Sequence, residues 1–215
     1  MRLDRVDAAL PAGVAVWRLA VDTDDDAVPA VLDAAERAHA ARLLRRADRA
    51  RFVQARAALR HLLGRRLGCA PDAVRLAVDP GGKPRLAGGA RPAFNVSHAG
   101  AWALIALGEA HDVGVDIERC APAPDLAELH AAILAPGEEE GGIGFYARWV
   151  AKEACVKAVG TGVADLQAVG VARTGDGNRI AVRGAPHWPR LTARWLATPD
   201  GYAAALAWRG MIDDT

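Results

Sequence analysis

Helices and short strands are grouped into two successive blocks, and this grouping constrains the fold of the chain most strongly. The first block opens with apolar residues at helical spacing over 29–68, and the second contains a helix predicted over 145–159 that ends at Gly160. A shorter helix is predicted after Pro124, up to Leu134. The predicted strands lie at 74–78, 94–97, 102–107, 113–118, 169–173, 179–183, 191–196 and 202–208. This grouping predicts an α+β fold rather than a doubly wound parallel sheet.

The two main predicted helices end in a similar way. AALRHLLG closes the first and ACVKAVG closes the second, each as an apolar run followed by glycine. The similarity is short, so it suggests an internal duplication of the chain without proving one.

The overall charge is nearly balanced, with 27 Lys and Arg against 26 Asp and Glu and a formal net charge of +1. One stretch departs from this balance, because residues 37–66 contain ten arginines and a single acid, Asp48. These arginines either coat the solvent-exposed face of a helix or form a face that binds anions. The sequence leaves both interpretations open.

Cysteine usage and hydropathy indicate a compartment. The three cysteines are widely spaced and form no CxxC pair, which favours a reducing environment. The N-terminal segment has early acidic residues and no long apolar stretch, unlike a signal peptide. No run approaches the ~20 apolar residues that a membrane span needs. We expect a cytoplasmic protein with no membrane partner.

The segment Gly114-Val115-Asp116-Ile117-Glu118 is the first candidate for chemistry. Side chains alternate between the two faces of a strand, so Val115 and Ile117 point toward a core and the two acids share the other face. Neighbouring carboxylates repel unless a cation lies between them, and Mg²⁺ prefers such oxygen ligands. The pattern equally fits the polar face of a half-exposed strand.

The second candidate is the helix that contains WVAKEACVK. Trp149, Glu153 and Lys157 are spaced four residues apart and therefore share one helical face. Glu153 and Lys157 form either an ordinary surface ion pair or a functional pair, with Glu153 as base or metal ligand and Lys157 as a phosphate partner. Local sequence does not separate these two interpretations.

The third candidate is FNVSH, where Ser97 and His98 lie at a predicted strand end and can converge on an anion with backbone amides. The distribution of lysine supports such a site. Of the 27 basic residues, 24 are arginine, and lysine occurs only at positions 83, 152 and 157. Because an ammonium group suits a single phosphate oxygen, these positions favour phosphate binding.

Four motifs in this order, GKP, FNVSH, GVDIE and WVAKEACVKAVGTG, resemble those of the Sfp-type 4′-phosphopantetheinyl transferases. The resemblance covers roughly residues 51–162. The chain departs from the family at Ala99, where a second serine is usual, and at Val163, where leucine is preferred. Neither departure touches the residues expected to perform chemistry.

The resemblance implies a monomer built as a pseudodimer of two similar α+β halves, residues 1–110 and 111–215, with coenzyme A bound between them. The implied reaction transfers the 4′-phosphopantetheine arm of coenzyme A to a serine of an acyl or peptidyl carrier protein. It releases adenosine 3′,5′-bisphosphate and depends on Mg²⁺. No nucleic-acid partner is expected.

The resemblance also implies a metal site. Asp116 and Glu118 would bind Mg²⁺ together with the pyrophosphate of coenzyme A. Glu138 would be a further acidic ligand, although Glu139 or Glu140 could take that place.

The resemblance implies roles for residues around the metal. Glu153 would deprotonate the carrier-protein serine, directly or as a metal ligand that orients a water, and Lys157 would neutralise charge on the bridging and leaving oxygens. Lys83, Ser97 and His98 would grip the phosphates at the nucleotide end of coenzyme A, including the 3′-phosphate. Arg51 and Arg56 of the first helix would reach either the 3′-phosphate or the acidic carrier protein.

Three alternatives remain at this stage. A small trimeric holo-acyl-carrier-protein synthase is disfavoured because this chain contains both halves. A nucleic-acid-binding module would use the arginine-rich helix, but it leaves GVDIE and WVAKEACVK unexplained. A non-catalytic protein that binds coenzyme A or a carrier would not need the acidic pair and Glu153.

Overall fold

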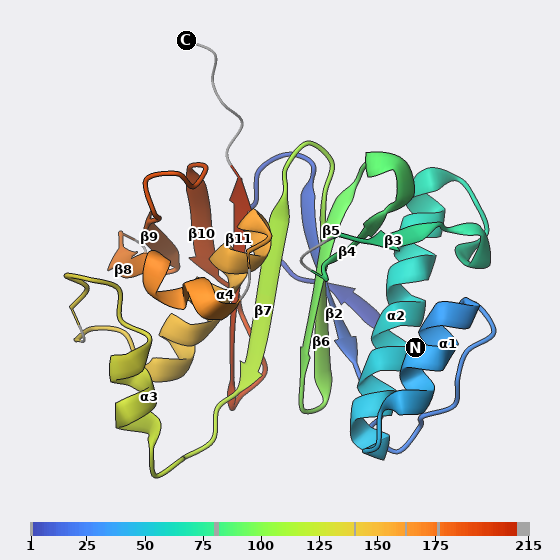
Figure 1. Ribbon diagram of the computed structural model, residues 1–215, viewed down its shortest axis with the longest axis horizontal. Helices are drawn as coiled ribbons and strands as arrows, with labels where there is room; N and C mark the ends of the chain where they lie inside the picture. The colour runs from blue at the N-terminus through green and yellow to red at the C-terminus, as the bar shows by residue number, and fades with distance from the viewer. Residues whose placement is uncertain (1, 80–81, 140, 162, 176, 210–215) are drawn as a thin grey trace.

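The computed structural model describes residues 2–79, 82–139, 141–161, 163–175 and 177–209. It shows two antiparallel sheets side by side, each covered by helices on its outer side (Figure 1). The first sheet has the strand order β1-β2-β6-β5. Its strands are β1 (Leu3–Arg5), β2 (Val14–Ala20), β5 (Ala93–Ala99) and β6 (Trp102–Gly108). The mixed α+β architecture predicted from the sequence is confirmed.

Helices and a small hairpin complete the first half. The helices are α1 (Ala34–Arg42) and α2 (Arg46–Leu67), and the hairpin pairs β3 (Leu76–Val78) with β4 (Pro84–Leu86). Short 3₁₀ turns lie at Pro71–Ala73 and Ala87–Gly89. The inner face of α2 packs on the sheet through residues such as Leu59 and Leu63, which are fully buried.

The second sheet has the order β7-β11-β10-β9-β8. Its strands are β7 (Val113–Arg119), β8 (Gly170–Thr174), β9 (Arg179–Arg183), β10 (Leu191–Trp195) and β11 (Tyr202–Arg209). Two helices, α3 (Leu126–Ala132) and α4 (Phe145–Val159), and a 3₁₀ helix at Val163–Ala168 accompany it. Among the described residues, no helix combines the length and apolar character needed to span a membrane.

The predicted first helix is wrong in its extent. The structure has two helices because an Asp33–Glu36 capping box starts α1 only at Ala34, and Leu43 adopts an extended conformation that ends it. The buried guanidinium of Arg60 on α2 pairs with both capping acids, with 2.7 Å to each, and so holds α1 against α2. One of the ten arginines therefore serves the core rather than a surface that binds anions.

Helix α4 approaches β7 very closely at Gly114. A Cβ atom at this position would lie 2.1 Å from the carbonyl oxygen of Ala154 and 2.4 Å from the backbone nitrogen of Ala158. Only glycine allows this approach. The predicted helix end at Gly160 is confirmed, since this residue has φ of 88° and its amide closes the helix on the carbonyl of Val156.

The two sheets meet along their edge strands β5 and β7 (Figure 1). Side chains of β5 reach backbone amides of β7 at this junction. The amide of Val115 donates to Asn95 Oδ1 at 2.9 Å, and the amide of Ile117 donates to Ser97 Oγ at 3.3 Å. The junction therefore fixes β7 relative to the first half through two polar side chains.

Candidate active site at the junction of the two halves

Three acids, Asp116, Glu118 and Glu153, form an acidic cluster at this junction. Asp116 and Glu118 come from alternate positions of β7, as predicted, while Val115 and Ile117 point into the core. Glu153 comes from α4. The face that carries the acids is covered rather than open to solvent, because the side chain of Asp116 is only 3% exposed.

Lys157 ties two members of the acidic cluster together. Its Nζ lies 2.6 Å from Asp116 Oδ1 and 3.7 Å from Glu153 Oε2. Ser97 Oγ also donates to Asp116 Oδ1, at 2.7 Å. The other oxygens, Asp116 Oδ2 and Glu153 Oε1, are buried and have no hydrogen-bond partner among the described residues.

The electrostatics of the cluster show an excess of negative charge. Burial and the charge of Asp116 raise the pKa of Glu118 to about 7; Lys157 opposes this shift and Glu153 adds to it. Burial also raises the pKa of Glu153, against the effect of Lys157 and with that of Asp116. One ammonium group thus leaves the three carboxylates incompletely neutralised.

The donor set of the acidic cluster fits a divalent metal ion. Burying a carboxylate oxygen without a partner costs free energy. Carboxylate oxygens are the ligands that hard cations such as Mg²⁺ prefer. Among the described residues, no group of three or more His, Cys, Asp and Glu side chains is already arranged as a metal site. The fit therefore rests on the two unpartnered oxygens and on the excess of negative charge.

Lys83 lies between the two halves. Its Nζ donates to the carbonyl of Lys157 at 2.5 Å and to the carbonyl of Val113 at 3.3 Å. Burial lowers the pKa of Lys83, while Asp112 and Asp79 oppose the shift. Two of its three donors are thus used inside the protein.

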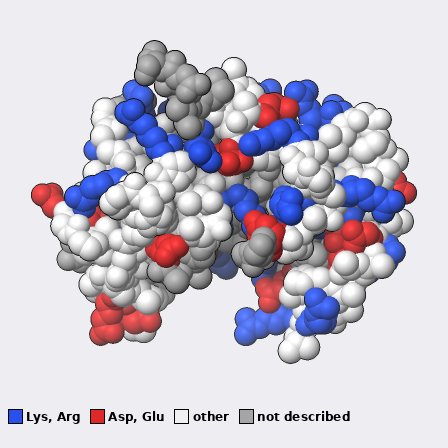
Figure 2. Space-filling model, turned by 45° about the horizontal axis from the view of Figure 1, so that its top comes forward, with Lys and Arg blue, Asp and Glu red and all other residues white. Residues whose placement is uncertain are grey.

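A small cavity of about 140 Å³ brings together two of the predicted phosphate-binding residues, Arg56 and His98, beside Phe52 and Pro84. The guanidinium of Arg56 lies over the Phe52 ring, 5.5 Å from its centroid. His98 is exposed at this cavity. Acidic and basic side chains both lie along the junction of the halves in the space-filling view (Figure 2).

Arg51 lies beside this region and not in the lining of the cavity. Its guanidinium donates to the carbonyl of Gly100 at 3.2 Å and forms an ion pair with Asp48. The structure therefore shows Arg51 held by its own helix and by the end of β5.

Glu138 belongs to a different site, a buried charge cluster that it forms with Arg148 and Lys152 of α4. Arg148 pairs with Glu138 Oε1 and Lys152 with Oε2, and the side chain of Glu138 is 4% exposed. The amide of Val171 also donates to this carboxylate. Both oxygens are therefore occupied, and we do not retain Glu138 among the metal ligands.

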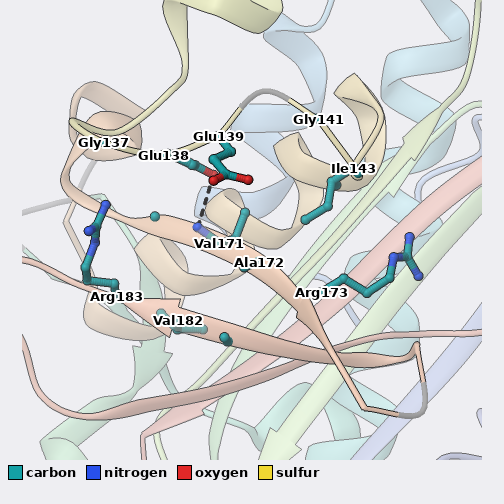
Figure 3. Close-up of a pocket in the computed structure, with 13 residues that line it drawn as sticks. Gly137, Glu138, Glu139, Gly141, Ile143, Val171, Ala172, Arg173, Val182 and Arg183 are labelled. Atoms are coloured by element: carbon teal, nitrogen blue, oxygen red, sulfur yellow. Dashed lines mark hydrogen bonds between the residues drawn. The ribbon is translucent and has the colours of Figure 1, made fainter.

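The segment of Glu138 also borders a cavity of about 510 Å³, which lies between residues 137–139 and 141–143 on one side and strands β8 and β9 on the other (Figure 3). Glu139, Arg173 and Arg183 line it. Glu139, the alternative metal ligand, is exposed and lies on this side. Glu140, the other alternative, lies outside the described residues.

Sequence reasoning missed the roles of Asn95 and Lys152. Asn95 and Ser97 alternate along β5, so the strand period could have placed both on the face that meets β7. Lys152 was grouped with the phosphate-binding lysines, yet its side chain is 0% exposed and is bound by carbonyl oxygens. Its position one residue before Glu153 turns it to another side of the helix.

Comparisons with known proteins agree with these motifs. A family model described as the 4′-phosphopantetheinyl transferase superfamily matches residues 112–207, and one described as the N-terminal part of 4′-phosphopantetheinyl transferase matches residues 19–110.

Curated relatives carry the same name. The 4′-phosphopantetheinyl transferase HetI of Nostoc is 32% identical over 214 residues, covering 92% of this chain and 88% of the relative. A putative 4′-phosphopantetheinyl transferase of Synechocystis is 37% identical over 156 residues, covering 66% of this chain and 63% of the relative. A Bacillus subtilis 4′-phosphopantetheinyl transferase is 25% identical over 147 residues, or 65% of each chain. The chain therefore belongs to the 4′-phosphopantetheinyl transferase family, as the order of its four motifs predicts.

Proposed function

We propose that this chain transfers the 4′-phosphopantetheine arm of coenzyme A to a serine of an acyl or peptidyl carrier protein, in a reaction that depends on Mg²⁺. The observation that carries the proposal is the acidic cluster at the junction of the halves. Two of its buried oxygens, Asp116 Oδ2 and Glu153 Oε1, have no hydrogen-bond partner among the described residues. They come from different elements, and the other oxygen of each carboxylate lies next to Lys157.

The metal would be held by Asp116 and Glu118 of β7, with Glu153 of α4 close by. When bound, Mg²⁺ would polarise the phosphoryl oxygens of coenzyme A and fix their geometry. Lys157 is the cation that acts on these carboxylates, and one positive charge does not balance three negative ones. This excess of negative charge favours uptake of a cation.

Glu153 is proposed as the general base. The serine oxygen of the carrier attacks the β-phosphorus, the bond from that phosphorus to the bridging oxygen breaks, and adenosine 3′,5′-bisphosphate leaves. The serine proton passes to Glu153, directly or through a water. Burial raises the pKa of Glu153, which brings the carboxylate closer to the basicity that proton transfer near neutral pH requires.

Lys157 is proposed to stabilise charge on the oxygens of the reacting phosphate. It lies on the same face of α4 as Glu153, and its side chain is 28% exposed, so its ammonium group can face a bound substrate. A fixed cation aimed at developing charge lowers the barrier to phosphoryl transfer.

The nucleotide end of coenzyme A is proposed to lie on the first half. Arg56 and His98 share the small cavity and would bind phosphate groups there, with Arg51 nearby. Lys83 has one ammonium hydrogen beyond the two used by carbonyls and would offer it to a phosphate. The two large sheets, one within residues 3–108 and the other within residues 113–209, support residues 1–110 and 111–215 as the two halves, and the proposed active form is a monomer.

A mass measurement on a carrier protein tests the proposal. The purified chain, apo carrier protein and coenzyme A are combined with Mg²⁺ or with EDTA. We expect the carrier to gain the mass of the phosphopantetheine arm only when Mg²⁺ is present. An unmodified carrier with every carrier type tried would refute the reaction, and full transfer in EDTA would refute the metal.

Two site variants and one control sharpen the test. Asp116→Ala should lose Mg²⁺-dependent transfer, and Glu153→Gln should lower kcat by about 100-fold or more, as expected for loss of a general base, with a smaller effect on the KM for coenzyme A. Glu128→Gln changes an exposed acid on α3 and should keep full activity. Normal turnover of Glu153→Gln would exclude the base role.

A further inference from the structure

Ser97 joins the two halves through contacts from β5 to β7. It is the only serine of the chain, and it is 8% exposed on β5. Its hydroxyl donates to Asp116 Oδ1 at 2.7 Å and accepts from the amide of Ile117 at 3.3 Å. The single hydroxyl hydrogen is thus committed to a carboxylate of the acidic cluster.

These contacts decide how the Asp116 carboxylate is oriented. Oδ1 receives hydrogen bonds from both Ser97 and Lys157, the second at 2.6 Å. Because a carboxylate group is planar, holding Oδ1 between two donors also fixes the direction of Oδ2. That second oxygen is the one that is buried without a partner among the described residues.

We infer that Ser97 is a positioning residue, which orients Asp116 so that Oδ2 faces the divalent cation. The inference rests on the proposed function. It adds a role for this serine to the phosphate contact that the family resemblance implies, because the hydroxyl already donates to Asp116 Oδ1.

Asn95 provides a matched control on the same strand. It lies two residues before Ser97 and also bridges β5 to β7, by accepting from the amide of Val115 at 2.9 Å. No hydrogen bond joins it to a carboxylate of the acidic cluster within the described part of the chain. Loss of Asn95 therefore weakens the junction without releasing Asp116.

The test is metal binding measured without turnover. Mn²⁺ is titrated calorimetrically into the full chain saturated with coenzyme A, for wild type, Ser97→Ala, Ser97→Thr and Asn95→Ala. Losing a group that orients a metal ligand typically costs about 10- to 100-fold in affinity, and we expect Ser97→Ala to weaken Mn²⁺ binding by this amount. Ser97→Thr keeps a hydroxyl and should stay close to wild type, and Asn95→Ala should lower thermal stability while keeping Mn²⁺ affinity.

Steady-state kinetics separate this role from phosphate binding. A positioning role raises the Mg²⁺ concentration for half-maximal rate in Ser97→Ala and leaves the KM for coenzyme A at saturating Mg²⁺ near wild type. The opposite pattern, a raised KM for coenzyme A with unchanged Mn²⁺ affinity, overturns the inference. If Ser97→Ala does not fold, Ser97→Cys, which keeps the volume and donates only weakly, carries the same comparison.

Failure of the inference is distinguishable from failure of the proposed function. A wild-type chain that transfers the arm in Mg²⁺, together with a Ser97→Ala chain of unchanged metal affinity, removes only the role of Ser97. A wild-type chain that binds no Mn²⁺ and transfers nothing removes both.

Discussion

Replacing Lys152 of α4 by methionine removes one of the two cations of the buried charge cluster formed by Glu138, Arg148 and Lys152. The Lys152 ammonium lies 2.5 Å from Glu138 Oε2 and also donates to the carbonyls of Ile133 at 2.6 Å, Val169 at 2.7 Å and Leu166 at 3.2 Å. These carbonyls belong to the segment after α3 and to the 3₁₀ region before β8. One side chain therefore holds two connecting segments to α4.

The expected loss in the free energy of unfolding follows from the groups that lose their partner in the variant. Breaking a buried ion pair by removing one partner costs about 3–5 kcal/mol. Each carbonyl left without a donor adds about 1–3 kcal/mol where water cannot reach it. Glu138 keeps Arg148 and two backbone amides as donors, which limits the first cost. We expect a loss of about 4 kcal/mol in the free energy of unfolding, or a fall in Tm of about 8–16 °C for a chain of this length.

Urea unfolding at pH 7, followed by circular dichroism, measures this loss. Arg65→Met is the matched control, because it replaces an exposed cation on α2 by the same side chain, and it should change stability by less than about 0.5 kcal/mol. A Lys152→Met variant that loses less than about 1 kcal/mol would show that methionine packs as well as the ion pair, as some buried pairs allow. The reasoning from the carbonyl contacts would then be refuted.

Two further predictions concern the packing and the pH dependence of the same half. Gly114→Ala places a Cβ atom 2.1 Å from the carbonyl oxygen of Ala154, so we expect a loss of about 3 kcal/mol in thermal unfolding, and an unchanged Tm would contradict the close packing. Burial acts to raise the pKa of Glu138, but hydrogen bonds from Lys152 and two backbone amides outweigh it and hold the pKa below the ordinary 4.5. The stability that Glu138 contributes is then complete above pH 4.5 and is lost as the pH falls through its lower pKa in the folded state. Glu138→Gln should therefore make the free energy of unfolding fall less steeply below pH 4.5. The same steepness in the variant and the wild type would contradict this prediction.

Local sequence signals predicted the second half well. The predicted helix over 145–159 coincides with α4, because both its apolar spacing and its terminal glycine are local features. The predicted strand at 202–208 differs from β11 by one residue, and those at 179–183 and 191–196 fall within one residue of β9 and β10. Turn residues between short apolar runs mark such strands without help from tertiary contacts.

The first half was predicted less well. Strand β2 was not predicted, although its partner β6 was, and the two pair between residues as distant as Val14 and Gly108. The start of α1 at Ala34 was also missed, although its Asp33–Glu36 capping box is a local signal. The ion pairs that hold α1 against α2 join these two acids to Arg60, which is 27 and 24 residues away. Contacts of this range do not show in the periodicity of either segment.

In the candidate site, periodicity predicted which side chains share a face but not how buried they are. Strand alternation placed Asp116 and Glu118 together, and the helical period placed Glu153 with Lys157. The expectation that the two acids face away from the core was incomplete, because α4 and β5 cover that face and leave Asp116 almost inaccessible. Burial is a property of the neighbours, and the pentapeptide does not contain them.

The contact between Ser97 and Asp116 shows why the site needs both halves. The two residues lie on edge strands of different sheets, and neither strand pairs its backbone with the other in a ladder. β5 is fixed by β6 on its far side and β7 by β11, so the contact between the serine and the acid requires both sheets to be in place. A shift of one residue between β5 and β7 would bring the neighbouring Val96 or His98 to Asp116 instead of the hydroxyl. The register between the two sheets, which no single motif encodes, therefore sets the orientation of the carboxylate on which the proposed chemistry depends.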